Sequence, residues 1–307
     1  MAKLSSIFRC PQRIRACPFC RPEFPGGKTL YKRIGIAIRI LPDTIQGMDD
    51  AAILRQLDAE RQTVADSDSR LERASHVVRA FGVGNTWAGI VYARFSPSET
   101  AAIVDGEISF FTALSQDFEW KVYSHDEPPD LLAQLRKRGF RVGEEEALMI
   151  RDLREFSPFL LAPLPAGVTV SPVKDERRIE DYLFVESAVW SCEPDKTREL
   201  LHSTLGDPLQ RDLAFVAYSD RKPAGCGRVT APPNSQFCGL WGGSVLPESR
   251  GRGIYRALLS ARIEHVRQFD SIRYLRVDAM PMSRPILEKY GFKRVASTWP
   301  AEWPPRR

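Results

Sequence analysis

A turn rich in glycine and arginine has the residue types that phosphate binding requires. Residues 244–259 read SVLPESRGRGIYRALL, in which Gly251 and Gly253 alternate with arginines. Glycine lets backbone amides approach phosphate oxygens without an intervening Cβ, and the first amides of a helix have no partner inside that helix. Arg250 and Arg252 add charged donors. We interpret the turn as a phosphate cradle; the alternative is a basic turn on a solvated surface.

Two common phosphate loops do not fit this turn. A G-x-G-x-x-G loop would need glycine at the position of Arg256, and a Walker loop would need lysine after its last glycine. A repetitive nucleic-acid-binding segment would lack strand and helix patterns on either side. Apolar residues recur at helical spacing from Ile254 to Val266, so we expect the turn to open a helix over residues 253–268.

The turn, together with a later segment, resembles the GNAT superfamily of N-acetyltransferases. The family's acetyl-CoA pyrophosphate loop reads Arg or Gln, two residues, Gly, one residue, Gly or Ala. Arg250 and Gly253 match this pattern, and Tyr255 departs from it. Downstream, PMSRPILEKYGFKRV resembles the family's final helix and Gly-Phe strand. The resemblance covers residues 167–307 and implies transfer of an acetyl or other short acyl group from acetyl-CoA to an amine.

The resemblance also implies a donor site along the strand LWGGSVL and the loop after it. Gly242 and Gly243 by themselves indicate a bulge or a close backbone approach, or else packing beneath a helix. In the family, pantetheine lies beside this strand, and a backbone amide near Gly243 would polarise the thioester carbonyl. The residues expected to contact the cofactor are Val245, Leu246, Arg250, Gly251, Arg252, Gly253, Ile254, Tyr255 and Ser283.

Two side chains are candidates for proton transfer in such a reaction. An attacking amine must lose a proton, and an acid can protonate the leaving thiolate. Asp278, which ends the strand-like YLRVDAM, is the candidate base, or else a turn or cap residue. Tyr290 is the candidate acid, or else a packing residue, since Leu287 stands where many family members have tyrosine. Ser283 could instead cap the last helix.

Alternating strand-like and helix-like segments predict the elements that hold these residues. The segments at 120–142 and 274–295 share the order strand, Asp, leucine-containing helix, Gly-Phe, Val, which aligns Asp126 with Asp278. We therefore expect an α/β fold with a mixed, mostly antiparallel central sheet and flanking helices, arranged as two tandem GNAT-like domains. The first copy has no matching loop and is expected to lack a donor site.

The expected divisions follow composition and proline content. They are a basic extension at 1–47, a degenerate GNAT-like domain at 48–153, a linker at 154–166 and the acyltransferase domain at 167–307. Residues 48–81 have a helix-like pattern and are expected to form two helical segments. The extension has nine Lys or Arg against two acidic residues, so we expect a flexible segment; a transit peptide is the alternative.

Composition and charge narrow the partners. The 307 residues have a net charge of +5, and the extension accounts for it, so the rest is nearly neutral and nucleic acid is not an expected partner. The absence of an uncharged apolar run of about 18 residues argues against a membrane span and favours a cytoplasmic protein. The expected partners are acetyl-CoA and an amine-bearing small molecule or protein.

The six cysteines do not indicate a metal site. CPFC at 17–20 has zinc or redox spacing, but no histidine lies nearby in the sequence to complete a zinc site. Cys226 and Cys238 lie in strand-like surroundings and are expected to be buried free thiols.

Three functions follow from these patterns. The first is an acyltransferase, specifically an acetyl-CoA-dependent N-acetyltransferase. The alternative is a non-catalytic acyl-CoA-binding or sensing module, because the family's tyrosine is absent at Leu287. The third is a nucleic-acid binder that uses residues 1–47, which would show strongly salt-dependent binding.

Overall fold

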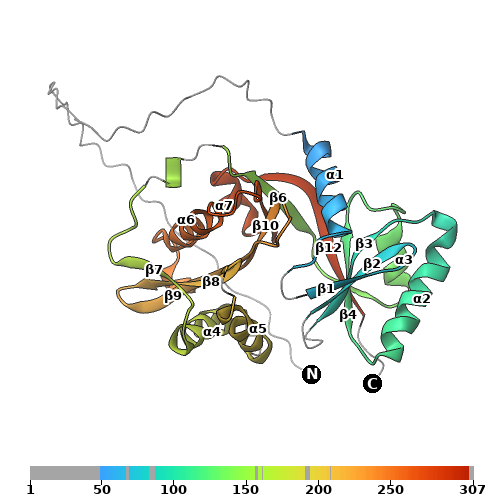
Figure 1. The fold of residues 1–307 in the computed structure, drawn as a ribbon, viewed down its shortest axis with the longest axis horizontal. Helices are drawn as coiled ribbons and strands as arrows, with labels where there is room; N and C mark the ends of the chain where they lie inside the picture. The colour runs from blue at the N-terminus through green and yellow to red at the C-terminus, as the bar shows by residue number, and fades with distance from the viewer. Residues whose placement is uncertain are drawn as a thin grey trace, which may run out of the picture. The chain divides into compact units, whose positions relative to one another are not determined.

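One mixed sheet runs through the chain in the computed structural model (Figure 1). The structure describes residues 49–66, 69–82, 87–155, 158–160, 162–190, 194–207 and 209–303. The basic extension and the CPFC motif lie outside these residues. We call the elements from α1 to β6 the first half and those from β7 to β12 the second half.

The described helices and strands alternate along the chain. The helices are α1 (Asp50–Arg61), α2 (Thr100–Ala113), α3 (Leu131–Lys137), α4 (Glu176–Trp190), α5 (Asp195–Leu205), α6 (Ile254–Val266) and α7 (Arg284–Lys289), with short 3₁₀ turns η2 (Pro97–Glu99), η3 (Pro158–Leu160) and η4 (Pro247–Ser249). The strands of the first half are β1 (Ser69–Arg73), β2 (Val77–Gly82), β3 (Ala88–Ala93), β4 (Phe118–Tyr123), β5 (Arg141–Val142) and β6 (Glu146–Asp152). Those of the second half are β7 (Val168–Pro172), β8 (Asp212–Ser219), β9 (Lys222–Thr230), β10 (Phe237–Val245), β11 (Tyr274–Ala279) and β12 (Lys293–Trp303).

The sheet is mostly antiparallel, with one parallel pair in each half. Its order is β1-β2-β3-β4-β12-β6-β11-β10-β9-β8-β7, and β5 pairs with β12. Strands β3 and β4 run parallel, as do β10 and β11. The predicted mixed, mostly antiparallel sheet with flanking helices is therefore confirmed.

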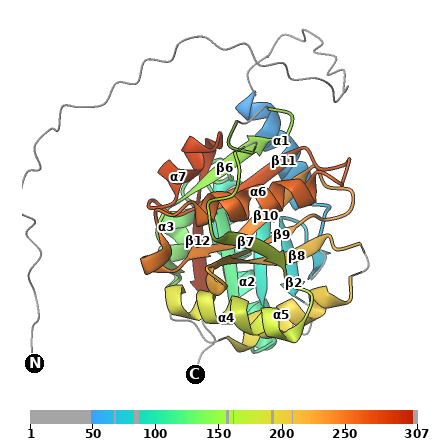
Figure 2. The same cartoon turned by 90° about the vertical axis from the view of Figure 1, so that its left-hand side faces the viewer.

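Helices cover both faces of the sheet. In the second half, α6 and α7 lie on one side of β7–β9, and α4 and α5 lie on the other (Figures 1 and 2). The apolar face predicted for α6 is buried: Leu258, Ile263 and Val266 are fully inaccessible. In the first half, α2 and α3 cover a separate core around Trp120. The apolar stripes of the helices thus explain why the sheet is enclosed by helices.

The two halves exchange strands. Strand β6 belongs to the first half in sequence, yet it lies between β11 and β12 of the second half. Residues 298–303 of β12 in turn pair with β4 of the first half. Each half therefore completes the other's sheet. The domain boundary after residue 153 stays a prediction. Strand β6, which precedes this boundary, is hydrogen-bonded to β11 and β12, which follow it.

The prediction of two helical segments in residues 48–81 was half wrong. The first segment is α1, whose start is capped by the Asp49 carboxylate, which accepts from Ala51 N at 3.1 Å. The second segment forms the antiparallel strands β1 and β2 instead. Strand β1 lies at the sheet edge and is only partly buried. Its sequence therefore has charged residues in place of the alternating apolar pattern of a buried strand. Tertiary pairing overrides the local pattern here.

The sequence repeat holds for the helices but not for the aspartates. Gly139 and Gly291 follow α3 and α7 with φ of +92° and +82°, where glycine is favoured. Asp278, however, lies within β11, whereas Asp126 follows the end of β4 by three residues. The two carboxylates therefore occupy different positions, because the strand-to-helix connections differ in length.

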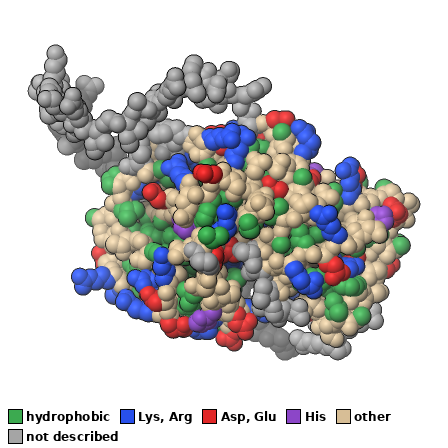
Figure 3. Space-filling model, in the orientation of Figure 1, with side chains coloured by type: hydrophobic (Ala, Val, Ile, Leu, Met, Phe, Trp, Pro, Cys, Tyr) green, Lys and Arg blue, Asp and Glu red, His purple; other side chains and the backbone are tan. Residues whose placement is uncertain are grey.

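Charged side chains of both signs are interspersed over the face seen in Figure 3. This distribution agrees with the near-neutral charge outside the extension. None of the described helices has the length and apolarity needed to cross a bilayer. The cytoplasmic location stays a prediction.

Candidate active site

The predicted cradle has the backbone geometry of an anion site. After β10 and η4, Gly251 and Gly253 take φ of +75° and +76°, a region that favours glycine. Gly253 is the N-cap of α6, and no side chain caps that helix. The first backbone bond of α6 runs from Ala257 N to Gly253 O at 3.0 Å, so the amides of residues 254–256 have no acceptor within the helix. Backbone donors and the helix dipole favour an anion at this point.

The arginines of the turn have different partners. Arg250 Nε donates to Val245 O at 3.3 Å, and Arg252 forms an exposed ion pair with Asp220 at 3.2 Å. Arg256, which was not predicted as a functional residue, donates to the carbonyls of Ala162 (2.9 Å) and Pro163 (2.6 Å). Arg256 therefore ties the linker to α6, while Arg250 and Arg252 stay at the surface.

The parallel strands β10 and β11 separate beside this turn. Their register ends at the pair Gly239 and Arg276, although β10 continues to Val245. On the other edge of β10, the register with β9 shifts between Trp241 and Ser244. The predicted bulge at Gly242 and Gly243 is therefore present, and Gly242 has a φ of +58°. The peptide groups of this bulge have no register partner in either neighbouring strand.

Buried polar atoms surround the bulge on both faces of the sheet. A Cβ on Gly242 would lie 2.7 Å from Tyr182 Oη and 3.7 Å from Glu186 Oε1, both on α4. A Cβ on Gly243 would lie 3.6 Å from Arg262 Nη2 on α6. The Tyr182 and Arg262 side chains are almost fully inaccessible.

Three buried polar atoms of these side chains have no nitrogen or oxygen partner among the described residues: Tyr182 Oη, Glu186 Oε2 and Arg262 Nη2. The neighbour of the tyrosine hydroxyl is the weakly polar Cys226 thiol. Burial raises the pKa of Tyr182 well above its usual value, and Glu186 adds to the rise, so this hydroxyl keeps its proton at neutral pH. Leaving buried donors and acceptors unpaired is costly, which points to a ligand at the bulge.

Tyr182 and Arg262 were missed in the sequence, although two signals could have found them. Tyr182 precedes Glu186 by four residues on a predicted helix, so both lie on one face. Arg262 follows Leu258 by four residues within the apolar stripe of α6. A charged residue in an apolar stripe requires an explanation, since an unpaired buried charge is destabilising.

The aromatic residues Tyr255 and Tyr290 pack against one another. Their ring centroids lie 6.4 Å apart, and Tyr290 also lies 4.7 Å from the ring of Phe159 in the linker. Tyr255 Cε2 would lie 3.2 Å from a Cβ on Gly243. Tyr255 therefore covers the bulge from the α6 side. Leu287, at the family's tyrosine position, is fully buried.

The remaining predicted cofactor residues line the loop or its support. Ile254 and Leu246 are buried in the cores on opposite sides of the sheet, and Val245 packs against the α6 core. Ser283 is the N-cap of α7, but its side chain makes no cap bond and its hydroxyl donates to Met280 O at 3.0 Å. Ser283 therefore caps α7 by position, as the alternative prediction had it, but without a side-chain cap bond.

Asp278 lies in a cavity between the two halves. Its carboxylate accepts from Lys121 Nζ at 3.3 Å and from the Thr298 hydroxyl at 3.3 Å. Lys121 also pairs with Glu146 at 2.5 Å. Burial alone would lower the pKa of Lys121, but Asp278 and Glu146 hold it above its usual value. Asp278 is therefore an ion-paired strand residue, and its alternative role as a turn or cap residue is wrong.

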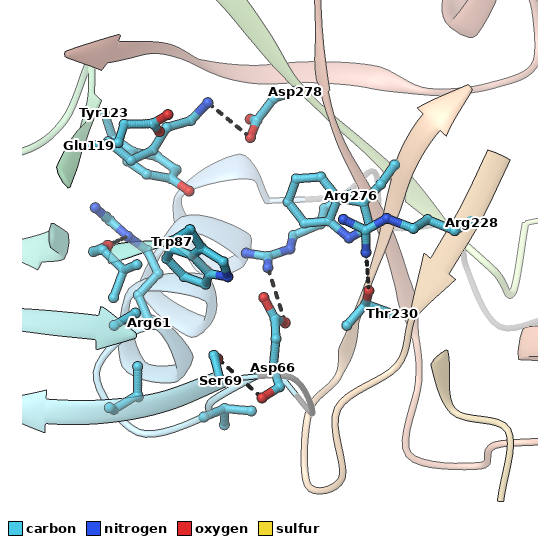
Figure 4. A pocket seen from close by; sticks show the side chains of 16 residues that line it. Arg61, Asp66, Ser69, Trp87, Glu119, Tyr123, Arg228, Thr230, Arg276 and Asp278 are labelled. Atoms are coloured by element: carbon cyan, nitrogen blue, oxygen red, sulfur yellow. Dashed lines mark hydrogen bonds and ion pairs between the residues drawn. The ribbon is translucent and has the colours of Figure 1, made fainter. Parts of the chain in front are cut away.

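The cavity has a volume of about 350 Å³ and takes side chains from β4, β9, β10 and β11 (Figure 4). Arg228, Trp241 and Arg276 line it from the second half, and Trp87 and Glu119 line it from the first. Burial raises the pKa of Glu119, and Lys121 opposes that rise. Residues from the first half were not predicted here, because only the strand exchange brings β4 near β11.

In the first half, a side chain of the protein occupies the opening between β3 and β4, which corresponds to the opening between β10 and β11. Strands β3 and β4 lose register after Ile90 and Trp120. The Arg61 guanidinium lies at this point: its Nε donates to Val91 O at 2.8 Å, and its Cζ lies 3.6 Å from the centre of the Tyr123 ring.

Both charged features of the first half's opening are satisfied within the chain. Arg61 is paired with Asp126 at 3.0 Å and with Asp58 at 2.7 Å, and its side chain is only 3% exposed. At the start of α2, the Glu99 carboxylate accepts from Ser96 N at 2.9 Å. A carboxylate at this helix terminus disfavours a phosphate there.

Comparison with known proteins assigns the second half to a family. Residues 178–292 match the family model of the acetyltransferase (GNAT) family. No curated protein sequence matches the chain. The matched residues are less than half of the chain, and they include most of α4, the bulge, the turn and α7.

Solved structures of the same fold cover most of the chain. A GCN5-related N-acetyltransferase from Kribbella flavida has a TM-score of 0.60 at 16% identity, over 84% of this chain and 95% of that one. A tandem GNAT protein from the clavulanic acid biosynthesis pathway has a TM-score of 0.53 at 16% identity, over 82% and 89%. A GCN5-related N-acetyltransferase from Sphaerobacter thermophilus has a TM-score of 0.53 at 13% identity, over 76% and 82%. At these identities the likeness concerns the fold.

Residues 178–292 of the second half therefore match a GNAT acetyltransferase domain, which confirms the predicted superfamily and enzyme class. The roles of the individual residues at the bulge and the turn stay proposals.

Proposed function

We propose that the second half transfers an acetyl group from acetyl-CoA to an amine. One observation carries this proposal: the parallel strands β10 and β11 separate beside a helix terminus that has no side-chain cap. The opening offers unpaired strand backbone for a pantetheine arm, and the terminus offers amides for a pyrophosphate. The family match supports acetyl-CoA as the ligand that uses both.

The donor would lie along β10 and end at α6. The amides of residues 251–255 would hold the pyrophosphate, with Arg250 and Arg252 as surface cations and Ile254 and Tyr255 in the first helical turn. Val245 and Leu246 would support pantetheine. Ser283, whose hydroxyl donates to a carbonyl, would contact the cofactor as an acceptor.

The reaction joins the amine nitrogen to the carbonyl carbon and breaks the carbon–sulfur bond. The amide of Gly243 would donate to the carbonyl oxygen as negative charge develops there, because the bulge takes this peptide out of strand register. The nitrogen loses one proton, and the sulfur leaves as thiolate or thiol. Catalysis therefore needs an acceptor for one proton and benefits from a donor for the other.

Tyr182 is the donor that the geometry favours. Its hydroxyl lies beside the bulge, where it is buried and protonated. It has no oxygen or nitrogen partner among the described residues. Tyr290, the donor proposed from the sequence, has its ring packed between Phe159 and Tyr255. It stays a second candidate.

Glu186 is the base that the same geometry favours. Its Oε2 has no described partner, and its Oε1 faces the bulge. Asp278 stays the alternative base, but its carboxylate is already engaged by Lys121 Nζ at 3.3 Å and by the Thr298 hydroxyl at 3.3 Å.

The first half is proposed to have no donor site. Arg61 occupies the opening between β3 and β4, and Glu99 places a negative charge at the start of α2. Both features oppose the binding of a pantetheine arm and a pyrophosphate. The first half would act instead by completing the sheet through β6 and by supplying one wall of the cavity.

A non-catalytic acyl-CoA-binding module is the second candidate function. The observation in its favour is Leu287, a buried aliphatic residue at the family's tyrosine position. Tyr182 counts against this alternative, because it offers a protonated hydroxyl from α4, whereas Leu287 lies on α7.

Thiol release distinguishes the two functions. We expect the full chain to release free CoA thiol from acetyl-CoA faster with at least one primary amine in a broad panel than without amine. A thiol-reactive dye measures the rate. Tight acetyl-CoA binding with no amine-dependent release across the panel would instead support the binding module.

A further inference from the structure

We propose that the cavity between the halves binds the acceptor, and that this acceptor carries an anionic group, a carboxylate or a phosphate, close to its amine. The inference rests on the proposed function and adds a substrate class to it. The cavity holds about 350 Å³, which suits a small molecule. Its wall includes Trp241, the residue next to the bulge where the thioester would lie.

Two guanidiniums flank one aromatic ring in this wall. Arg228 Cζ lies 5.6 Å and Arg276 Cζ 5.8 Å from the centre of the Trp241 ring. They come from β9 and β11, on either side of β10. The indole Nε1 of Trp241 is buried and has no partner among the described residues. The two guanidiniums, which can only donate hydrogen bonds, therefore gather in one part of the cavity, where they match an oxyanion.

The two arginines make only long contacts within the described residues, so their N–H groups remain available to a ligand. Arg228 reaches the Thr230 hydroxyl at 3.4 Å, and Arg276 reaches the Asp66 carboxylate at 3.8 Å (Figure 4). Both distances are longer than the 2.7–2.9 Å typical of charge-assisted bonds.

The other cations that line the cavity are already neutralised at shorter range. Lys121 pairs with Glu146 at 2.5 Å, and Arg61 pairs with Asp58 at 2.7 Å. An incoming anion therefore finds its most favourable electrostatic interaction at the Arg228–Arg276 end of the cavity.

The amine of such a ligand would lie toward the bulge. Tyr182 and Glu186 border Gly242, which follows Trp241 directly in the chain. Arg228 acts electrostatically on Tyr182, so we place the anion site close to the bulge, and an acceptor whose amine and anionic group are close together would fit both. α-Amino acids and aminoalkyl phosphates have this arrangement.

The far wall would take the rest of the acceptor. Leu71, Val91 and Trp87 of the first half supply apolar surface there. Glu119 lies on the same wall, where burial raises its pKa and the nearby Lys121 opposes that rise. The first half would therefore select the acceptor, although it holds no donor.

Matched ligand pairs test this inference by binding, without turnover. The full chain loaded with CoA is titrated in a calorimeter with L-phenylalanine against 2-phenylethylamine, and with O-phosphoethanolamine against ethanolamine. We expect the anionic member of at least one pair to bind at least tenfold more tightly. The pair that shows the preference identifies carboxylate or phosphate. Equal or reversed preference in both pairs, or no binding of any probe, would overturn the proposal.

Variants locate the preference. Arg228→Gln and Arg276→Gln should each weaken the preferred anionic probe at least tenfold and change its neutral partner less than twofold. Arg141→Gln, at an exposed arginine of β5, is the matched control and should leave both unchanged. A preference that survives both cavity variants would contradict this site. CoA binding by the same samples reports separately on the donor site, so a failure of the proposed function is distinguishable.

Discussion

Tyr182→Phe is expected to lower kcat about a hundredfold while leaving acetyl-CoA affinity within about twofold. The change removes one hydroxyl and keeps the buried ring, so the core around α4 is preserved. Loss of a proton donor to the leaving sulfur fits a reduction of this size, which is about 2.7 kcal/mol of activation free energy. Steady-state thiol release and calorimetry with acetyl-CoA measure the two quantities.

The same substitution should not destabilise the fold. The Tyr182 hydroxyl is buried without an oxygen or nitrogen partner among the described residues, so its removal relieves a desolvation cost. We expect the free energy of unfolding to stay the same or rise by up to about 1 kcal/mol. An activity loss without a stability loss would separate a catalytic role from a structural one.

Tyr218→Phe is the matched control. Tyr218 is also a tyrosine of the α4 core, but its hydroxyl donates to Asp181 at 2.7 Å. This variant should lose about 1 kcal/mol of stability and keep its kcat. If Tyr182→Phe kept full kcat as well, Tyr182 would be a packing residue and Tyr290 would become the leading candidate for the acid.

Gly251→Asp is expected to weaken acetyl-CoA binding about thirtyfold or more. A carboxylate at the proposed cradle would repel the pyrophosphate by about 2 kcal/mol at the intermediate dielectric of a surface site. A Cβ at Gly251 would meet no atom within 4 Å, so the substitution adds charge without a clash. Calorimetric titration at low and high salt measures the effect, which screening should reduce at high salt.

Gly251→Asn is the control for the backbone. Asparagine and aspartate have nearly the same shape, and both tolerate the φ of +75° found here better than other side chains do. The asparagine variant should bind within about threefold of the unsubstituted chain. Equal weakening by both substitutions would assign the effect to backbone strain and would argue against an anion at this turn.

Gly253 is a less suitable position for this test. Its φ is similar, but a Cβ there would lie 2.8 Å from the Pro165 ring. A substitution would therefore displace the linker as well as change the charge. The contact follows from the path of the linker over α6, which Arg256 fixes through carbonyls at positions 162 and 163.

Local patterns were enough to predict the glycine turn and the helix that follows it. Glycine spacing, a following amphipathic stretch and a preceding strand fix where a helix begins, and these features are close in sequence. The Gly242 and Gly243 pair likewise predicted a bulge or close backbone approach, with packing beneath a helix as the alternative, and the bulge is present.

The acceptor side depends on contacts between distant residues. The cavity exists because β12 pairs with β4 and β6 enters the other half's sheet, and no local pattern encodes those pairings. The closure of the first half's opening depends on an ion pair between Arg61 and Asp126, 65 residues apart. Tyr182 and Arg262 stand at positions that the sequence could have marked, but their lack of partners among the described residues is visible only once the fold surrounds them.

A calorimetric titration of acetyl-CoA into the full chain tests the central claim most directly. One open donor site in the second half and a filled opening in the first predict a stoichiometry of one acetyl-CoA per chain. A stoichiometry of two would contradict the proposed closure by Arg61 and Glu99. No binding at all would contradict the donor site itself.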